Sequence, residues 1–293
     1  MFGRRVLLFL FLTIFLTPTV VPALAQAAAD KNPVRLLYVE WDCAKATTHL
    51  AKAAIEDRLG RKVETISVTA AAMWVGLASG DADAMLTAWL PVTHKEYLQK
   101  VQGKVTDLGP LATGARLAWT VPEYVSVTTI ENLNEHAAKF NGRIVGIDPG
   151  AGYMSLSEKA LKEYGLKNFE LQSGSDATMT AALADAIRRK EWIVVLGWSP
   201  HWMFGRWKLH TLDDPKKVFG ETETINTFAR LGLEKDIPEV YAFLDRFHYE
   251  HVDQLQTLMG WNTEKGADLL ANARRFMKEH PELVNSWFEG GKN

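Results

Sequence analysis

The chain has little cysteine and no excess of basic residues, and each of these features excludes a class of protein. Its 293 residues contain one cysteine, Cys43, which excludes an internal disulfide and any CxxC metal or redox site. The formal net charge is -2, with 33 basic and 35 acidic residues, so the basic excess typical of nucleic-acid binding is missing. Hydrophobic (47%) and charged (23%) contents are ordinary, which argues against disorder and against a multi-span membrane protein. The length suggests a globular protein of two domains.

The first residues predict an export signal. Two arginines near the start precede an apolar run at 6–16, and a small-x-small pattern of the kind that signal peptidase accepts ends at Ala25. The apolar run has about half of the ~20 residues that a membrane span needs. No cysteine lies at the cleavage site, so we expect no lipid anchor. We therefore predict a signal peptide at 1–25 and a freely diffusing periplasmic protein with a buried thiol.

Predicted strands alternate with predicted helices along the mature chain. Short apolar runs predict strands at 34–39, 63–68, 84–89, 143–147 and 192–196. Helical spacing predicts helices at 44–59, 70–78, 155–164 and 177–189. This alternation is typical of an α/β protein with mainly parallel sheets covered by helices on both faces. From residue 214 onward the pattern predicts helices to the end of the chain.

Tryptophans stand at the ends of three predicted strands, namely Trp41, Trp89 and Trp198. Ligands of parallel sheets bind beyond the carboxyl ends of the strands, so these rings are expected in one pocket. An indole face attracts a cation that has no hydrogen bonds to donate, such as a methylated ammonium. A sugar can stack on the same rings, and Asp42 and Asp148 could meet its hydroxyls, although no Asn or Gln stands beside the tryptophans. Both ligand classes stay open at this point.

A glycine-rich turn, Gly150-Ala151-Gly152-Tyr153, follows another predicted strand and leads into a helix. Backbone N–H groups at such a turn, together with the partial positive charge of a helix start, bind anions. The turn lacks the third glycine of a dinucleotide-binding motif, and a plain strand-to-helix turn is the alternative. Combined with the tryptophans, it predicts a ligand with a quaternary ammonium at one end and a carboxylate at the other, which is the shape of glycine betaine.

Four segments of the chain resemble the OpuAC-type substrate-binding proteins of glycine betaine ABC transporters. They read YVEWD at 38–42, AWLPVTH at 88–94, GIDPGAG at 146–152 and GWSPHWMF at 197–204. The resemblance implies a two-lobed periplasmic-binding-protein fold of type II, which closes on a ligand in the cleft between its lobes. We expect one lobe to combine residues 28–119 with 213–293, and the other to cover 120–212.

The resemblance also implies roles for six residues. In that family three tryptophans surround the trimethylammonium group, and the matching residues here are Trp41, Trp89 and Trp198. The ligand carboxylate is held by two backbone N–H groups, which match Gly152 and Tyr153, and by a histidine that matches His94. The chain departs from the family at Cys43, where serine is usual, and at Tyr153, where a smaller aliphatic residue is common.

The expected function is therefore capture of a methylated-ammonium osmolyte for a membrane permease. Receptors for trimethylamine N-oxide, carnitine, choline or proline betaine remain alternatives, followed by a sugar-binding protein and a periplasmic hydrolase. The chain has no GxSxG, HExxH or GxxxxGK motif, so we expect no enzyme and no cofactor. His248 and His251 lack a third ligand nearby, so we expect no metal site. We expect a monomer without a nucleic-acid partner.

Overall fold

The computed structural model describes residues 32–290, so the signal peptide predicted at 1–25 lies outside the described residues. Nine strands follow one hydrogen-bonded order, β2-β1-β3-β9-β4-β7-β5-β6, with β8 paired to β4. Their bounds are β1 (Val34–Tyr38), β2 (Val63–Ser67), β3 (Ala84–Leu90), β4 (Val105–Pro122), β5 (Arg143–Val145), β6 (Glu170–Gln172), β7 (Val195–Ser199), β8 (Leu209–Thr211) and β9 (Glu223–Arg230).

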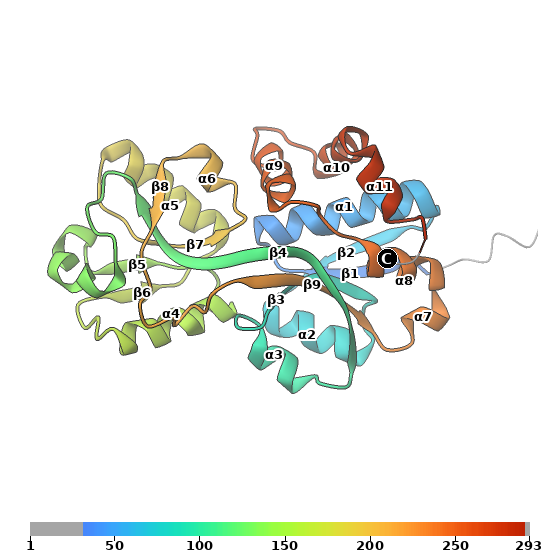
Figure 1. The fold of residues 1–293 in the computed structure, drawn as a ribbon, viewed down its shortest axis with the longest axis horizontal. Coiled ribbons are helices and arrows are strands. Elements are labelled where there is room, and N and C mark those ends of the chain that lie inside the picture. The colour runs from blue at the N-terminus through green and yellow to red at the C-terminus, as the bar shows by residue number, and fades with distance from the viewer. Residues whose placement is uncertain (1–31, 291–293) are drawn as a thin grey trace, which may run out of the picture. The chain divides into compact units, whose positions relative to one another are not determined.

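The long strand β4 connects two groups of elements (Figure 1). Its residues from Val105 to Ala115 pair with β9, and its residues from Arg116 to Thr120 pair with β7. We call the elements around β1, β2, β3 and β9 the first lobe, and those around β5, β6, β7 and β8 the second lobe. Because β4 takes part in both sheets, the chain makes this crossing between the lobes within a strand.

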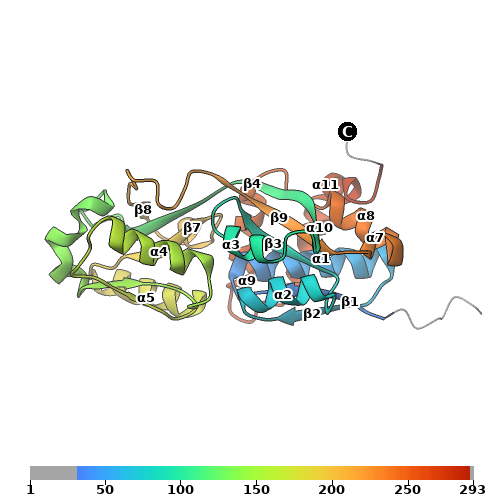
Figure 2. The same ribbon diagram turned by 90° about the horizontal axis from the view of Figure 1, so that it is seen from below.

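Helices cover both faces of each sheet. In Figure 1 the first-lobe strands lie between α1 and α2, and the second-lobe strands lie between α4 and α5; Figure 2 views the same layers from the side of α2 and α4. In chain order the helices are α1 (Asp42–Leu59), α2 (Ala70–Ser79), α3 (Lys95–Lys100), the 3-10 helix η2 (Ile130–Phe140), α4 (Gly152–Glu163), α5 (Asp176–Arg189), α6 (Met203–Arg206), α7 (Leu233–Asp236), α8 (Pro238–Arg246), α9 (Val252–Asn262), α10 (Leu269–Glu279) and α11 (Pro281–Ser286).

Small side chains let α1 pack closely against its sheet. Its buried face is rich in alanine, including Ala44, Ala51 and Ala54, all fully buried. The helix begins directly after β1 and ends at Gly60, whose φ of 62° is a left-handed conformation that glycine adopts without strain. Since α1 starts where β1 ends, its N-terminus faces the edge of the sheet at which ligands of α/β proteins bind.

The predicted alternation of strands and helices is confirmed, and so is the α/β class. The sheets are mixed rather than mainly parallel, since β4 and β9 add antiparallel pairs to the parallel pairs of β1 with β2 and of β5 with β6. The prediction that the chain is helical after residue 214 is wrong, because β9 lies there. Its sequence ETINTFAR is rich in β-branched residues, and its position between β3 and β4 buries most of them.

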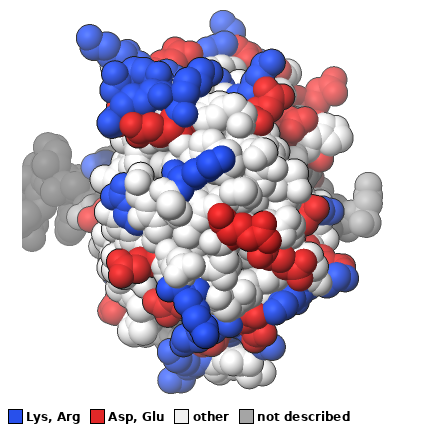
Figure 3. Space-filling model, turned by 90° about the vertical axis from the view of Figure 1, so that its left-hand side faces the viewer, with Lys and Arg blue, Asp and Glu red and all other residues white. Residues whose placement is uncertain are grey.

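In the described part of the chain, no helix combines the length and the apolar character needed to cross a bilayer. Figure 3 shows the side of the molecule that the second lobe occupies in Figure 1, where lysine and arginine side chains gather near acidic ones. Ion pairs of the second lobe include Arg188 and Arg189 with Asp185 and Lys208 with Glu123. These basic groups are therefore partly neutralised by neighbours.

Candidate functional site

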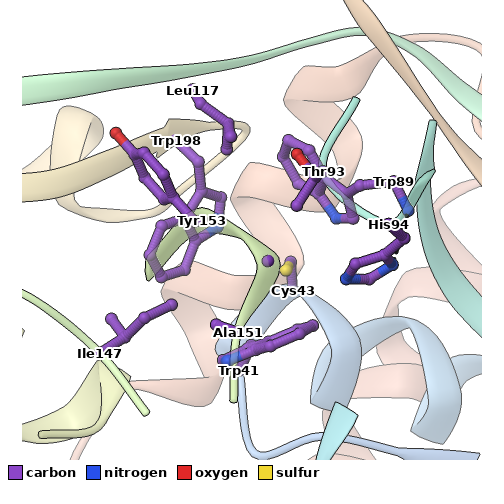
Figure 4. A pocket seen from close by; sticks show the side chains of 11 residues that line it. Trp41, Cys43, Trp89, Thr93, His94, Leu117, Ile147, Ala151, Tyr153 and Trp198 are labelled. Carbon is purple, nitrogen blue, oxygen red and sulfur yellow. Dashed lines mark hydrogen bonds between the residues drawn. The ribbon is translucent and has the colours of Figure 1, made fainter. Parts of the chain in front are cut away.

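A small cavity lies where the two lobes meet. Figure 4 shows the side chains that line it, which come from both lobes. The lining residues are Trp41, Cys43, Trp89, Thr93, His94, Leu117, Ile147, Ala151, Gly152, Tyr153 and Trp198. All six residues singled out in the sequence are among them, whereas Thr93, Leu117, Ile147 and Ala151 were not anticipated.

Three buried indole rings form much of the cavity wall (Figure 4). Trp41 directly precedes α1, Trp89 is part of β3, and Trp198 is part of β7. Their exposed fractions are 6%, 4% and 4%. Two rings thus come from the first lobe and one from the second, so the complete cage exists only when the lobes are together.

A carboxylate of the second lobe fixes the orientation of Trp41. The indole Nε1–H of Trp41 donates a hydrogen bond to Oδ2 of Asp148 at 2.6 Å. Figure 4 shows the Trp41 ring nearly edge-on below the cavity, so that its face is turned toward the enclosed space. Because the acceptor of the N–H is Asp148, the ring offers the cavity its π face, the part that attracts cations.

His94 is a neutral hydrogen-bond donor in the wall of the cavity. It is fully buried, and its Nδ1 accepts a hydrogen bond from the backbone N–H of Trp89 at 3.1 Å. An Nδ1 that accepts leaves the proton of the neutral ring on Nε2. Burial lowers the pKa of His94 from 6.5 to about 4, so the ring is uncharged at neutral pH. Its buried Nε2 has no partner among the described residues and is free to donate to a ligand.

The start of α4 supplies two more donors. Gly152 and Tyr153 are its first two residues, and the preceding Ala151 makes no side-chain cap. The first N–H groups of a helix have no intrahelical acceptor, and the helix dipole adds partial positive charge there. Within residues 32–290, no hydrogen bond to protein is recorded for these two N–H groups. The site thus offers hydrogen-bond donors from the start of α4 and from His94.

Cys43 and Tyr153 are polar side chains of the cavity wall that carry no charge. Burial raises the pKa of the Cys43 thiol to about 12, with Asp176 and Asp42 adding to the effect, so the sulfur stays protonated. The buried hydroxyl of Tyr153 has no partner among the described residues, and its ring packs edge-to-face on Phe219 at 5.4 Å. Cys43 and Tyr153 therefore bring no formal charge to the cavity at neutral pH.

The two carboxylates considered for a sugar are engaged elsewhere. Asp148 accepts from Trp41, and Oδ2 of Asp42 accepts from the indole N–H of Trp202 at 2.7 Å. Neither aspartate lines the cavity. A ring of hydroxyls would therefore meet few free acceptors, which disfavours a sugar. The arrangement suits a small ligand with an apolar cationic end and an anionic end.

Comparison with known proteins gives a consistent picture. The family model described as OpuAC, substrate binding domain of ABC-type glycine betaine transport system, matches residues 32–279. The glycine betaine/carnitine transport binding protein GbuC of Listeria monocytogenes is 41% identical over 154 residues, which are 52% of this chain and 51% of GbuC. The aligned part thus spans about half the length of that relative.

Two solved structures resemble the fold over most of the chain. Lactococcal OpuAC, closed and in complex with glycine betaine, has 39% identity and a TM-score of 0.83, covering 88% of this chain and 100% of that one. The glycine/betaine/L-proline-binding protein ProX from Borrelia burgdorferi has 36% identity and the same TM-score of 0.83, covering 88% of this chain and 97% of that one. The type II periplasmic-binding-protein fold is thereby confirmed.

Proposed function

Because the chain belongs to the family of substrate-binding domains of ABC-type glycine betaine transport systems, we propose that it captures glycine betaine or a closely related methylated onium compound. Relatives with the same fold are described as binding glycine betaine or glycine betaine and carnitine. The bound ligand would then be delivered to the permease of an ABC transporter.

One observation carries this proposal: the cavity wall combines three indole rings with unpaired hydrogen-bond donors. A trimethylammonium group gains about 0.5 to 2 kcal/mol from each desolvated aromatic contact with Trp41, Trp89 or Trp198. His94 Nε2–H and the N–H groups of Gly152 and Tyr153 are the donors for a carboxylate. No ionised side chain lines the cavity, so a ligand without net charge is favoured over a simple cation or anion.

The hydrogen-bond donors also rank the alternatives. Choline has a hydroxyl in place of a carboxylate, and one hydroxyl oxygen cannot accept from all three donors, so at least one buried donor stays unpaired at a cost of about 1 to 3 kcal/mol. Trimethylamine N-oxide is shorter than a betaine, because its oxygen is bonded directly to the nitrogen, and it ranks lower as well. Proline betaine and carnitine carry both groups and differ in bulk, so they rank directly below glycine betaine.

We further propose that the lobes move as two bodies, residues 28–119 with 213–293 and residues 120–212. The aromatic cage takes rings from both lobes, so a ligand gains its full contact energy only in the closed form. A ligand shifts a conformational equilibrium by its difference in affinity for the two states, and here that difference favours closure. The permease would then recognise the closed form.

Export with cleavage near residue 25, a periplasmic location and a monomeric state complete the proposal. Binding without turnover is expected as well, because burial keeps both His94 and the Cys43 thiol of the cavity wall in their neutral forms. The ligand should therefore be recovered chemically unchanged.

Isothermal titration calorimetry on the purified mature chain tests the function. Glycine betaine, proline betaine, carnitine, choline, trimethylamine N-oxide and a disaccharide form the panel. We expect heat and the tightest binding with glycine betaine, and none with the disaccharide. Absence of heat with every onium compound would refute the proposal, and proton NMR of the recovered ligand would reveal a hydrolase by its products.

A further inference from the structure

Beside the cavity, three side chains of the two lobes come together without lining it. Side-chain atoms of Asp42, Asp176 and His201 lie within 4.8 Å of one another. Asp42 begins α1 in the first lobe, whereas Asp176 begins α5 and His201 follows β7 in the second. Asp176 is 1% exposed and His201 is fully buried.

The carboxylate of Asp176 bridges the lobes. Its Oδ2 accepts the backbone N–H of Asp42 at 2.9 Å, and its Oδ1 lies 3.2 Å from Nε2 of His201. The N–H of Asp42 is the first of α1, and Asp176 is itself the first residue of α5. One buried negative charge therefore sits at the N-termini of two helices, where both dipoles stabilise it.

A second contact runs in the opposite direction. The indole N–H of Trp202 in the second lobe donates to Oδ2 of Asp42 in the first lobe at 2.7 Å. Oδ1 of Asp42 lies 3.3 Å from Nζ of Lys45 within the first lobe. Asp42 thus uses both its backbone and its side chain to hold the second lobe.

These atoms are arranged for hydrogen bonding rather than for a metal ion. Nδ1 of His201 accepts the backbone N–H of Met203 at 3.2 Å, which places the proton of the neutral ring on Nε2. A protonated Nε2 donates to Asp176 and has no lone pair for a cation. Oxygen atoms of Asp42 and Asp176 already accept N–H groups. The three side chains therefore form a hydrogen-bonded set that is complete without an ion.

Two of these three side chains are linked to the cage tryptophans Trp41 and Trp198. The rings of His201 and Trp198 form a T-shaped pair with a centroid distance of 4.6 Å and an angle of 88°. Asp42 directly follows Trp41 in the chain. Closing the contact between Asp42 and Asp176 therefore fixes both Trp41 and Trp198 without placing either aspartate in the cavity.

We infer that Asp176 is a positioning residue for ligand binding: its carboxylate latches the N-terminus of α1 to the second lobe and so holds the cage closed. The inference rests on the proposed function for its ligand, but the latch acts between the lobes and not on the ligand. Its loss should accelerate opening while leaving the encounter of ligand and open protein unchanged.

Stopped-flow tryptophan fluorescence with glycine betaine tests this role on Asp176→Asn. An amide of the same size can accept only one of the two donors, because its NH₂ group faces the other. We expect the dissociation rate to rise roughly tenfold or more, in keeping with a lost hydrogen bond to a charged group, and the association rate to stay within about twofold. Asp185→Asn on the same helix, whose carboxylate pairs with Arg188 and Arg189, should leave both rates unchanged.

A second pair of variants isolates the backbone hydrogen bond. Asp42→Ala removes only the carboxylate, whereas Asp42→Pro also removes the N–H, and proline is tolerated at the first position of a helix. Dissociation should be faster for the proline variant than for the alanine variant. Equal rates for these two, or an unchanged dissociation rate in Asp176→Asn, would overturn the latch.

A measurement without ligand separates failure of the latch from failure of the proposed function. Spin labels on cysteines introduced at Gln99 and Lys159, both exposed and in different lobes, report the distance across the cleft. Asp176→Asn should shift the distribution to longer distances than in the wild type. Identical distributions would overturn the latch even if no betaine binds. A dissociation rate altered by EDTA or zinc chloride would overturn it in favour of a metal site.

Discussion

The carbonyl oxygen of Thr93 lies 2.0 Å from the point where a side-chain carbon would stand on Gly152. Thr93 belongs to the loop after β3 in the first lobe, and Gly152 begins α4 in the second. The two backbones therefore approach so closely that only glycine fits. This contact holds the start of α4, with its unpaired N–H groups, against the first lobe.

We expect Gly152→Ala to block closure of the cleft. The added methyl group would collide with a backbone atom, which cannot rotate away as the tip of a side chain can. The collision exists only when the lobes are together, so each lobe should still fold. Calorimetry should show affinity for glycine betaine lowered by roughly a hundredfold or more, a loss of about 3 kcal/mol, while the thermal midpoint without ligand stays close to that of the wild type.

The neighbouring glycine of the same turn is the matched control. A side-chain carbon on Gly150 would meet no atom within 4 Å. Gly150→Ala should therefore bind glycine betaine nearly as the wild type does. Equal losses of affinity in both variants would mean that the turn acts through its flexibility and not through its contact with Thr93.

Each cage tryptophan should contribute to affinity more than a tryptophan elsewhere. Alanine at position 41, 89 or 198 removes one aromatic contact and should weaken binding roughly tenfold or more. Trp261→Ala is the control, since Trp261 is half-buried and its ring lies under Arg275. Trp287 is unsuitable because it is fully buried among Phe243 and Phe247. If Trp261→Ala weakened binding as much as the cage variants, the cage assignment would be wrong.

The thiol of Cys43 should be inert in the folded protein. It is 3% exposed, and burial raises its pKa to about 12, so the reactive thiolate is scarce at pH 8. Ellman's reagent should release one equivalent of chromophore in guanidinium chloride and far less in buffer within the same time. Glycine betaine should slow the residual reaction further, since the thiol lines the cavity. Rapid labelling of the native protein would show that the cavity is open to the reagent.

The position of the cage could be predicted from the sequence because its tryptophans lie at the ends of predicted strands. Trp41, Trp89 and Trp198 each follow or end a short apolar run, and the glycine turn follows another. Ligand sites of α/β sheets lie at such positions, so the pattern alone suggested a shared pocket. The resemblance to OpuAC-type proteins then added His94, which has no pattern of its own.

Other features depend on contacts that no local pattern records. The strand β4 contains irregular register between Asp107 and Gly109 and again between Pro110 and Ala112, which breaks the alternation that predicts strands. Asp176 and Asp42 are 134 residues apart, and the carboxylate of one finds the helix start of the other only after both lobes have folded. Nothing in the sequence near Asp176 distinguishes it from an ordinary aspartate at the start of a helix.

The last prediction concerns how stability changes with pH. The pKa of His94 is about 4 in the folded protein and 6.5 in the unfolded chain. Above pH 6.5 the ring is neutral in both states and contributes no pH dependence. Between pH 6.5 and 4 the unfolded chain binds a proton that the folded protein does not, so stability falls as pH falls. The slope is about 1.4 kcal/mol per pH unit, and the total is about 3 kcal/mol.

Urea unfolding of the wild type and of His94→Gln at pH 7, 5.5 and 4.5 measures this contribution. Glutamine can accept from the N–H of Trp89 and still donate into the cavity, but it does not titrate. The other titrating groups are common to both proteins, so they cancel in the difference. The wild type should lose more free energy of unfolding than the variant between pH 7 and 4.5. If the free energies of unfolding of the two proteins fell in parallel, His94 would bind its proton in the folded protein as readily as in the unfolded chain. Its Nδ1 could then not accept the N–H of Trp89 at pH 4.5.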